Sequence, residues 1–192
     1  MNTLCTLDQI LSLYEKHGKE TYIGEPVSFL QHSLQCGTLA ERSKMPIPII
    51  IGAFFHDIGH LIGFELGCAQ LVGPDGVVLG TVDHESLGAN CLDKLGFPKT
   101  VTDVIRYHVD AKRYKVSKDP NYLDNVSPAS IDTLKLQGGP MSKDEMAKFA
   151  LLPNLDVILA VRSFDEAAKD PAMETPPLSY FASMAKSYLQ SL

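Results

Sequence analysis

One apolar segment, AFFHDIGHLIG at residues 53–63, constrains the fold more than any other feature of the chain. Its hydrophobic residues favour a helix buried in a core, yet it carries His56, Asp57 and His60. An unpaired charge in such surroundings is costly or forces the group to become neutral. Either something binds these polar groups, or the interpretation of the segment as an apolar core helix is wrong.

Composition indicates a globular chain of ordinary size. The 192 residues are 45% hydrophobic and 21% charged, and we expect one domain spanning residues 1–192. A net charge of -6 argues against a nucleic-acid partner, which usually meets a basic face. The basic run at 110–118 is interpreted mainly as solvated surface.

Cysteine usage and the N-terminal segment bear on the compartment. Cys5, Cys36, Cys68 and Cys91 are scattered without a C-x-x-C pair, which is typical of reduced, mostly buried thiols. Residues 1–20 lack the features of a signal peptide, and no apolar run reaches the roughly 18 residues of a membrane span. We expect a cytoplasmic protein with no membrane partner.

The periodicity predicts an all-α fold, a single helical bundle of about eight to ten helices. Apolar residues recur at spacings of three and four, and strand-type alternation is scarce. Continuous helices are expected over 46–63 and 98–114, with Thr6, Asp83 and Ser142 as N-caps of others. A long glycine-rich loop near residues 63–81, around Pro74-Asp75-Gly76, is expected to form at most a small hairpin.

Histidines on separate predicted helices form a candidate metal site. A single histidine on a helix is more often a hydrogen-bonded core residue than a ligand, and His17 is interpreted as a helix-end residue. Helical bundles, however, build metal sites from inward-pointing side chains on facing helices. The candidates with this placement are His32, His56, His84 and His108.

Two acids complete the candidate site. Asp57 follows His56 directly, about 100° around a helix, and its two carboxylate oxygens could bridge two ions. Asp165 lies on an otherwise apolar predicted helix near the C-terminus.

The order of these residues resembles the H…HD…D pattern of the HD-domain metalloproteins. The resemblance rests on His32, the pair His56-Asp57 and the distant Asp165. Two further histidines, His84 and His108, mark the HD subset with a dinuclear site. The resemblance implies one ion on His32, His56, Asp57 and Asp165, and a second on Asp57, His84 and His108.

Further motifs are similar to one group of HD-domain proteins along nearly the whole chain, the mixed-valent diiron oxygenases of 1-hydroxy-2-aminoethylphosphonates. These motifs are YIGE (22–25), QHSLQC (31–36), AFFHDIGHL (53–61), DHE (83–85), HVDAKRY (108–114), SPAS (127–130) and LQGGPM (136–141). The resemblance implies two iron ions, mixed-valent Fe(II)/Fe(III), with O2 as co-substrate. It also implies cleavage of a C–P bond to give phosphate plus glycine or glycine betaine, and a functional link to an upstream hydroxylating oxygenase.

Residue spacing supports a small phosphonate substrate. Lys112 lies one helical turn after His108 on the same face, where an ammonium suits a dianionic head group. Ser130, Thr133 and Gln137 recur at three- and four-residue spacing and could donate hydrogen bonds to it. Without the resemblance, Lys112 would be interpreted as a solvent-exposed charge.

Three more residues are candidates for catalysis and substrate binding. The resemblance implies that Glu25 pairs with the substrate's ammonium group and that Tyr22 covers the site or faces the cation. Glu25 also fits a helix-entry residue favoured by the helix dipole. His60 is expected to form hydrogen bonds near the substrate or O2 rather than to bind metal.

Three alternatives remain at this level. An HD-domain phosphohydrolase of a nucleotide or phosphate monoester would use metal-activated water. A polyol oxygenase and a ligand-sensing module are the others. Ligand types alone do not identify the metal, and the choice between a primary amine and a trimethylammonium substrate stays open.

Overall fold

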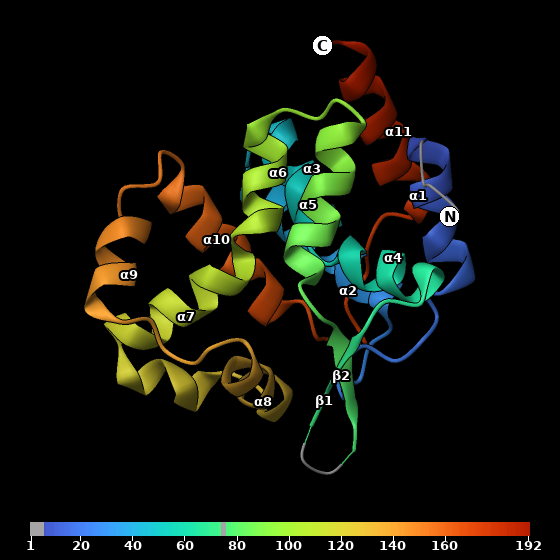
Figure 1. The fold of residues 1–192 in the computed structure, drawn as a ribbon. Coiled ribbons are helices and arrows are strands. Elements are labelled where there is room, and N and C mark those ends of the chain that lie inside the picture. Colours follow the sequence, from blue (N-terminus) through green and yellow to red (C-terminus); the bar gives the residue numbers. More distant parts are fainter. Residues whose placement is uncertain (1–5, 74–75) are drawn as a thin grey trace.

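The computed structural model describes residues 6–73 and 76–192, and within these ranges it confirms the all-α fold (Figure 1). Eleven α-helices are present there, more than the eight to ten expected, with one 3-10 helix and a two-stranded sheet. The α-helices are α1 (Leu7–Lys16), α2 (Phe29–Arg42), α3 (Ile47–Phe55), α4 (Ile58–Leu66), α5 (His84–Lys94), α6 (Lys99–Arg106), α7 (His108–Lys118), α8 (Pro128–Leu136), α9 (Lys143–Phe149), α10 (Leu155–Ala167) and α11 (Leu178–Gln190). The remaining elements are the 3-10 helix Pro120–Asn125 and the strands β1 (Gln70–Val72) and β2 (Val78–Thr81).

Two predicted helices are each broken in two, which explains the higher count. The expected helix over 46–63 is α3 and α4, bent by 42°, with the break at His56 and Asp57. The expected helix over 98–114 is α6 and α7, broken at Tyr107. The prediction that His56 and Asp57 lie on one continuous helix is therefore wrong.

Close packing of α4 on α5 accompanies the first break. A Cβ atom at Gly59 would lie 1.8 Å from the carbonyl oxygen of His84, so only glycine permits this approach. The break thus turns α4 so that its first turn meets the first residue of α5, which brings Asp57 and His84 near each other.

All three predicted N-cap residues stand at N-cap positions, and two of them form cap hydrogen bonds. Thr6 and Ser142 each form a capping box, accepting a hydrogen bond from the backbone N–H three residues on. Asp83 stands at the N-cap position of α5, but its side chain forms no cap hydrogen bond and its φ is +53°. His17 is the C-cap residue of α1, the helix-end position expected for it.

The core surrounds the central helices. α3 packs against α2 and α6, and α5 packs against α4 and α6 (Figure 1). On one side, α11 closes the core through Phe181, whose ring stacks on Phe54 at 5.1 Å. On the other side, α10 runs along α2 and α7, so that the late part of the chain reaches the central helices.

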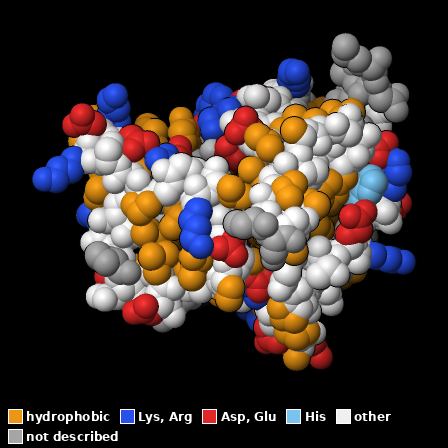
Figure 2. Space-filling view, turned by 60° about the horizontal axis from the view of Figure 1, so that its bottom comes forward, with side chains coloured by type: hydrophobic (Ala, Val, Ile, Leu, Met, Phe, Trp, Pro, Cys, Tyr) orange, Lys and Arg blue, Asp and Glu red, His pale blue; other side chains and the backbone are white. Residues whose placement is uncertain are grey.

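The expected loop near residues 63–81 is more ordered than predicted. Residues 63–66 belong to α4, and β1 and β2 then form an antiparallel hairpin with a register irregularity between Gln70 and Val72. Pro74 and Asp75 lie outside the described residues. Figure 1 shows the hairpin projecting from the body, and Figure 2 turns this side forward, showing hydrophobic side chains interspersed with charged ones.

Two further expectations concern thiols and membranes. Cys36 is buried and Cys68 partly buried, both as free thiols, whereas Cys5 lies outside the described residues. Within the described ranges no single helix is long and apolar enough to cross a membrane. The bent pair α3–α4 is together long and apolar enough, but most of its residues are buried in the core.

Candidate metal centre and adjoining cavity

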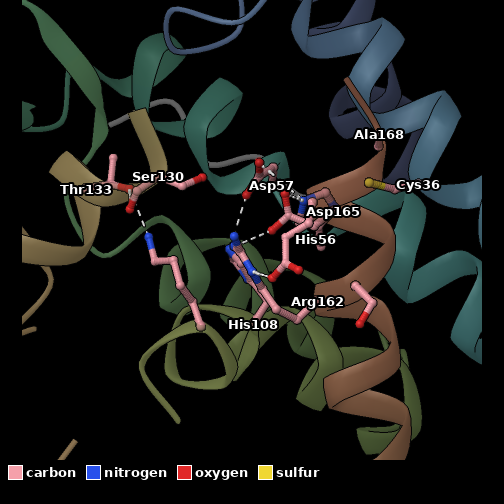
Figure 3. Close-up of polar contacts among 12 residues, drawn as sticks. Cys36, His56, Asp57, His108, Ser130, Thr133, Arg162, Asp165 and Ala168 are labelled. Carbon is pink, nitrogen blue, oxygen red and sulfur yellow. Dashed lines mark hydrogen bonds and ion pairs between the residues drawn. The ribbon is translucent and has the colours of Figure 1, made fainter. Parts of the chain in front are cut away.

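Six predicted ligand residues converge at the centre of the fold. They come from α2, the α3–α4 break, the first residues of α5 and α7, and α10, and each is at most 4% exposed. These residues are His32, His56, Asp57, His84, His108 and Asp165. Figure 3 shows His56, Asp57, His108 and Asp165 pointing toward one another from these elements.

The first group of donor atoms lies around one oxygen of Asp57. Its Oδ2 is 3.3 Å from His56 Nε2 and 3.6 Å from His32 Nε2. Asp165 Oδ1 is 3.3 Å from His32 Nε2 and 3.8 Å from His56 Nε2. A metal about 2.1 Å from each donor separates neighbouring donors by roughly 3.0–3.4 Å, so this spacing is close to that of a bound ion.

The second group lies around the other oxygen of Asp57. Oδ1 is 3.2 Å from His108 Nε2 and 3.4 Å from His84 Nε2, and the two imidazole nitrogens are 3.0 Å apart. Asp57 therefore presents a different oxygen to each group. A carboxylate placed in this way could bridge two ions.

Backbone carbonyl groups orient three of the four imidazoles. Because a carbonyl oxygen only accepts, Nδ1 of each ring carries the proton, which leaves the lone pair of Nε2 facing the cluster. The pairs are His32 with Ala168 (2.8 Å), His56 with Ala53 (2.8 Å) and His108 with Ile105 (2.7 Å). On the fourth ring, Nδ1 of His84 lies 3.5 Å from Glu85 Oε2.

The cluster favours positive charge. Burial alone would raise the pKa of Asp57, but His56 and the other imidazoles hold it well below its ordinary value. Burial likewise would raise the pKa of Asp165, which Arg162 and neighbouring histidines hold well below its ordinary range. Conversely, burial lowers the pKa of His56, yet Asp57 raises it well above normal, so a bound ion would replace the proton on Nε2. Two buried, ionised carboxylates thus attract cations, as a metal centre requires.

Arg162 was missed by the sequence analysis. Its Nη1 donates to Asp165 Oδ2 at 2.5 Å and its Nε donates to Glu166 Oε1 at 2.8 Å. Asp165 therefore offers only Oδ1 to the histidines. The signal was available, because Arg162 stands one helical turn before Asp165 on α10.

His60 differs from the four histidines in its protonation. The backbone N–H of Thr81 donates to Nδ1 of His60 at 2.9 Å, so the proton of the neutral ring is on Nε2, 4.0 Å from Asp57 Oδ1. Burial, and then His84, hold the pKa of His60 well below its ordinary value. Donor atoms of Asp57, His60 and His84 are close enough for a metal, but a protonated Nε2 has no lone pair for one.

Cys36 adds a soft donor beside the cluster. It lies one turn after His32 on α2, with Sγ 3.8 Å from His32 Nε2. His32, Cys36 and His56 are together close enough to hold a metal ion. Cys36 was not among the metal ligands expected from the sequence.

A cavity opens beside the cluster and is lined by every residue predicted to bind substrate. These are Tyr22, Glu25, His60, Lys112, Ser130, Thr133 and Gln137. Residues that the sequence analysis did not single out also line it, among them Leu79 of β2, Arg162 and Lys169. In Figure 3, Ser130 and Thr133 face the cluster from α8.

Lys112 lies inside this cavity, only 4% exposed, so it is not part of a solvated basic surface. Its Nζ donates to Thr133 Oγ1 at 2.9 Å and to Gln137 Oε1 at 2.6 Å. Burial, and then the charge of Arg162, lower its pKa to about 7.

Tyr22 and Glu25 enter the cavity from the segment before α2. Tyr22 stacks on His32 at 3.9 Å, and its hydroxyl donates to Asp57 Oδ2 at 2.7 Å. Glu25 instead pairs with Lys169, whose Nζ lies 2.7 Å from Glu25 Oε1. Ser130 is also within reach of Lys169, at 3.4 Å, rather than joining Thr133 and Gln137 around Lys112.

The chain is similar to known proteins over most of its length. The HD domain family matches residues 29–150, a match that ends before Asp165. The 1-hydroxy-2-(trimethylamino)ethylphosphonate dioxygenase (glycine-betaine-forming) of Leisingera caerulea is 44% identical, covering 91% of this chain and 85% of its own length. The hydroxymethylphosphonate dioxygenase of Gimesia maris is 33% identical, covering 95% and 89% respectively. An uncharacterised protein of Acanthamoeba polyphaga mimivirus is 36% identical, covering 95% and 81%.

Proposed function

Because the chain belongs to the HD-domain family, we propose that it is a diiron oxygenase that uses O2 to cleave the C–P bond of a 1-hydroxyphosphonate. The substrate is an (R)-1-hydroxy-2-ammonioethylphosphonate, in its 2-amino or 2-trimethylammonio form. The products are phosphate and glycine or glycine betaine. Two relatives named as phosphonate dioxygenases support this reaction class.

The observation that carries the proposal is the placement of the two oxygens of Asp57 against two separate groups of imidazole nitrogens. Four neutral imidazoles and two carboxylates suit iron, with three donors or more for each ion. The first ion would be held by His32, His56, Asp57 and Asp165, and the second by Asp57, His84 and His108. A bound Fe(II)/Fe(III) pair supplies the binding and reduction of O2.

The chain's own residues bind and orient the phosphonate. Lys112 and Arg162 are buried basic side chains in the cavity, and Nη2 of Arg162 has no hydrogen-bond partner among the described residues. Thr133 and Gln137 add a hydroxyl and an amide beside Lys112. A dianionic head group would gain charge-assisted hydrogen bonds here, which holds the C1 carbon beside the metal pair.

His60 and Tyr22 line the same cavity, beside the two groups of candidate ligands. The Nε2–H of His60 would donate to an oxygen of the substrate or of O2, since Thr81 fixes that tautomer. Tyr22 covers the face of His32 and bonds to Asp57, so it restricts access of water to the first group of ligands.

Substrates with a C1 hydroxyl require a preceding reaction that installs it. We propose a functional link to an upstream hydroxylating oxygenase that acts on the parent phosphonate.

The test is aerobic turnover of iron-loaded protein with both substrate forms, following phosphate release and O2 consumption together. We expect phosphate and O2 in fixed proportion, and no phosphate when O2 is removed. An HD-domain phosphohydrolase of a nucleotide or phosphate monoester would instead release phosphate from such an ester under anaerobic conditions. Absence of phosphate from both phosphonates would reject the proposal.

A further inference from the structure

We propose that Lys169 occupies, with its own ammonium group, the subsite that would receive a primary ammonium at C2 of the substrate, and so controls selectivity at that position. This inference rests on the proposed function. Lys169 lies just beyond α10, past the end of the HD-domain match.

The surroundings of Lys169 fit a primary ammonium group. Its Nζ lies 2.7 Å from Glu25 Oε1, 2.9 Å from Ser127 Oγ and 3.4 Å from Ser130 Oγ. A primary ammonium has three N–H donors, and three acceptor atoms surround it here. The pair is largely buried, with side chains 15% exposed for Lys169 and 10% for Glu25.

The charges lining the cavity leave the ion pair of Glu25 and Lys169 to control binding of a cationic substituent. The carboxylates among the described lining residues are Glu25, Asp57 and Asp165, and the last two face the metal centre. Glu25 is thus the acid left for a cationic substituent, and Lys169 already neutralises it. An incoming ammonium must displace the Nζ of Lys169 to reach Glu25.

The KM values of the three candidate substrates should respond differently to removal of Lys169. A primary ammonium can form each of the hydrogen bonds that the Nζ of Lys169 formed. A trimethylammonium has no N–H to offer Ser127 and Ser130, so it regains only the charge attraction of Glu25. A hydroxymethylphosphonate has no substituent at this position and leaves the subsite empty.

The experiment compares Lys169→Met with wild type on the 2-amino, 2-trimethylammonio and hydroxymethyl substrates. We expect KM for the 2-amino substrate to fall about 10-fold, the worth of one charge-assisted hydrogen bond. KM for the hydroxymethyl substrate should stay within about 2-fold of the wild-type value, because this substrate leaves the subsite empty. A change of that size is smaller than the effect of a single hydrogen bond. The trimethylammonio substrate should gain less than the 2-amino one.

Two variants serve as controls. Lys169→Arg keeps a cation beside Glu25 and should retain the selectivity of wild type. Adding Glu25→Gln to Lys169→Met should abolish the gain for the 2-amino substrate. Iron content and thermal unfolding midpoint, measured for each variant, identify any variant that fails to fold.

Two results would overturn the inference. An equal rise in KM for all three substrates would mean that Lys169 binds the phosphonate, and unchanged KM values in a folded Lys169→Met would mean that the ion pair is structural. Failure of the proposed function looks different, because wild type would then release no phosphate from any of the three substrates.

Discussion

The backbone N–H of Thr81 donates a 2.9 Å hydrogen bond to Nδ1 of His60, and Thr81 Oγ1 donates a second, at 3.2 Å, to the His60 carbonyl. Strand β2 therefore fixes both the position and the tautomer of a ring that stacks on His84 at 3.8 Å. A histidine held in this way faces the centre as a donor, whereas the candidate ligand histidines would bind metal through the lone pair of Nε2.

This difference predicts that His60→Ala binds as much iron as wild type but has a lower kcat. We expect kcat to fall about 100-fold, as for loss of one aimed donor at a reacting centre. Colorimetric iron analysis should give wild-type content, and His60→Gln, which retains an N–H donor, should recover part of kcat. A variant that bound half the iron of wild type would show that His60 is a ligand instead.

Gly80 is predicted to be essential for the position of the His60 ring. Its φ is +101°, and a Cβ atom there would lie 2.3 Å from His60 Cε1. We expect Gly80→Ala to lower kcat together with the free energy of unfolding, the latter by about 1–3 kcal/mol from backbone strain. The matched control is Gly76→Ala, at φ +79° with nothing within 4 Å of the added Cβ, which should lose stability but not kcat. Urea unfolding and steady-state kinetics provide the two readouts.

The candidate ligands could be picked out from the sequence because histidine and aspartate are rare in apolar surroundings. His32 and Asp165 stand far apart in the chain, yet each interrupts a hydrophobic face, and burial of such residues demands a partner. Their order then matched a known pattern. The all-α class followed from periodicity in the same direct way.

The helix breaks and the ion pair of Glu25 with Lys169 could not be predicted from residue type and spacing. Apolar spacing continues through His56 and Tyr107, so it gives no sign that α4 and α7 start anew. The partner of Glu25, Lys169, is 144 positions away, and only the packing of the chain after α10 brings the two together. Each outcome depends on tertiary contacts, which local patterns do not encode.

Asp57 should control the occupancy of both ions. Its two oxygens face separate groups, so Asp57→Ala removes a donor from each, and we expect most of the iron to be lost. His84→Ala removes a donor from the second group alone and should retain one ion. Glu15→Gln, at an exposed position of α1 away from the cluster, is the control and should bind as wild type. Equal iron content in Asp57→Ala and His84→Ala would argue against a bridging role.

Lys112 predicts proton uptake when phosphonate binds. Burial and then Arg162 lower its pKa to about 7 from an ordinary 10.5, so above pH 7 most free enzyme carries a neutral amine there. A dianion beside the amine favours its charged form and raises that pKa. Binding at pH 8 should therefore take up a proton, and the uptake should diminish below pH 7, where Lys112 is already charged. Calorimetry in buffers of different ionisation enthalpy measures it, with Lys112→Met as the control without uptake from this group.

The same shift predicts how stability depends on pH. Between about 7 and 10.5 the unfolded chain holds the Lys112 proton and the folded chain does not. Since stability rises with pH wherever the unfolded state binds more protons, this group makes the free energy of unfolding increase over that window. Lys112→Met should remove that contribution, seen as a flatter pH profile in urea unfolding. An unchanged profile, together with equal proton uptake by both proteins, would mean that Lys112 is charged throughout and that the uptake arises at another group.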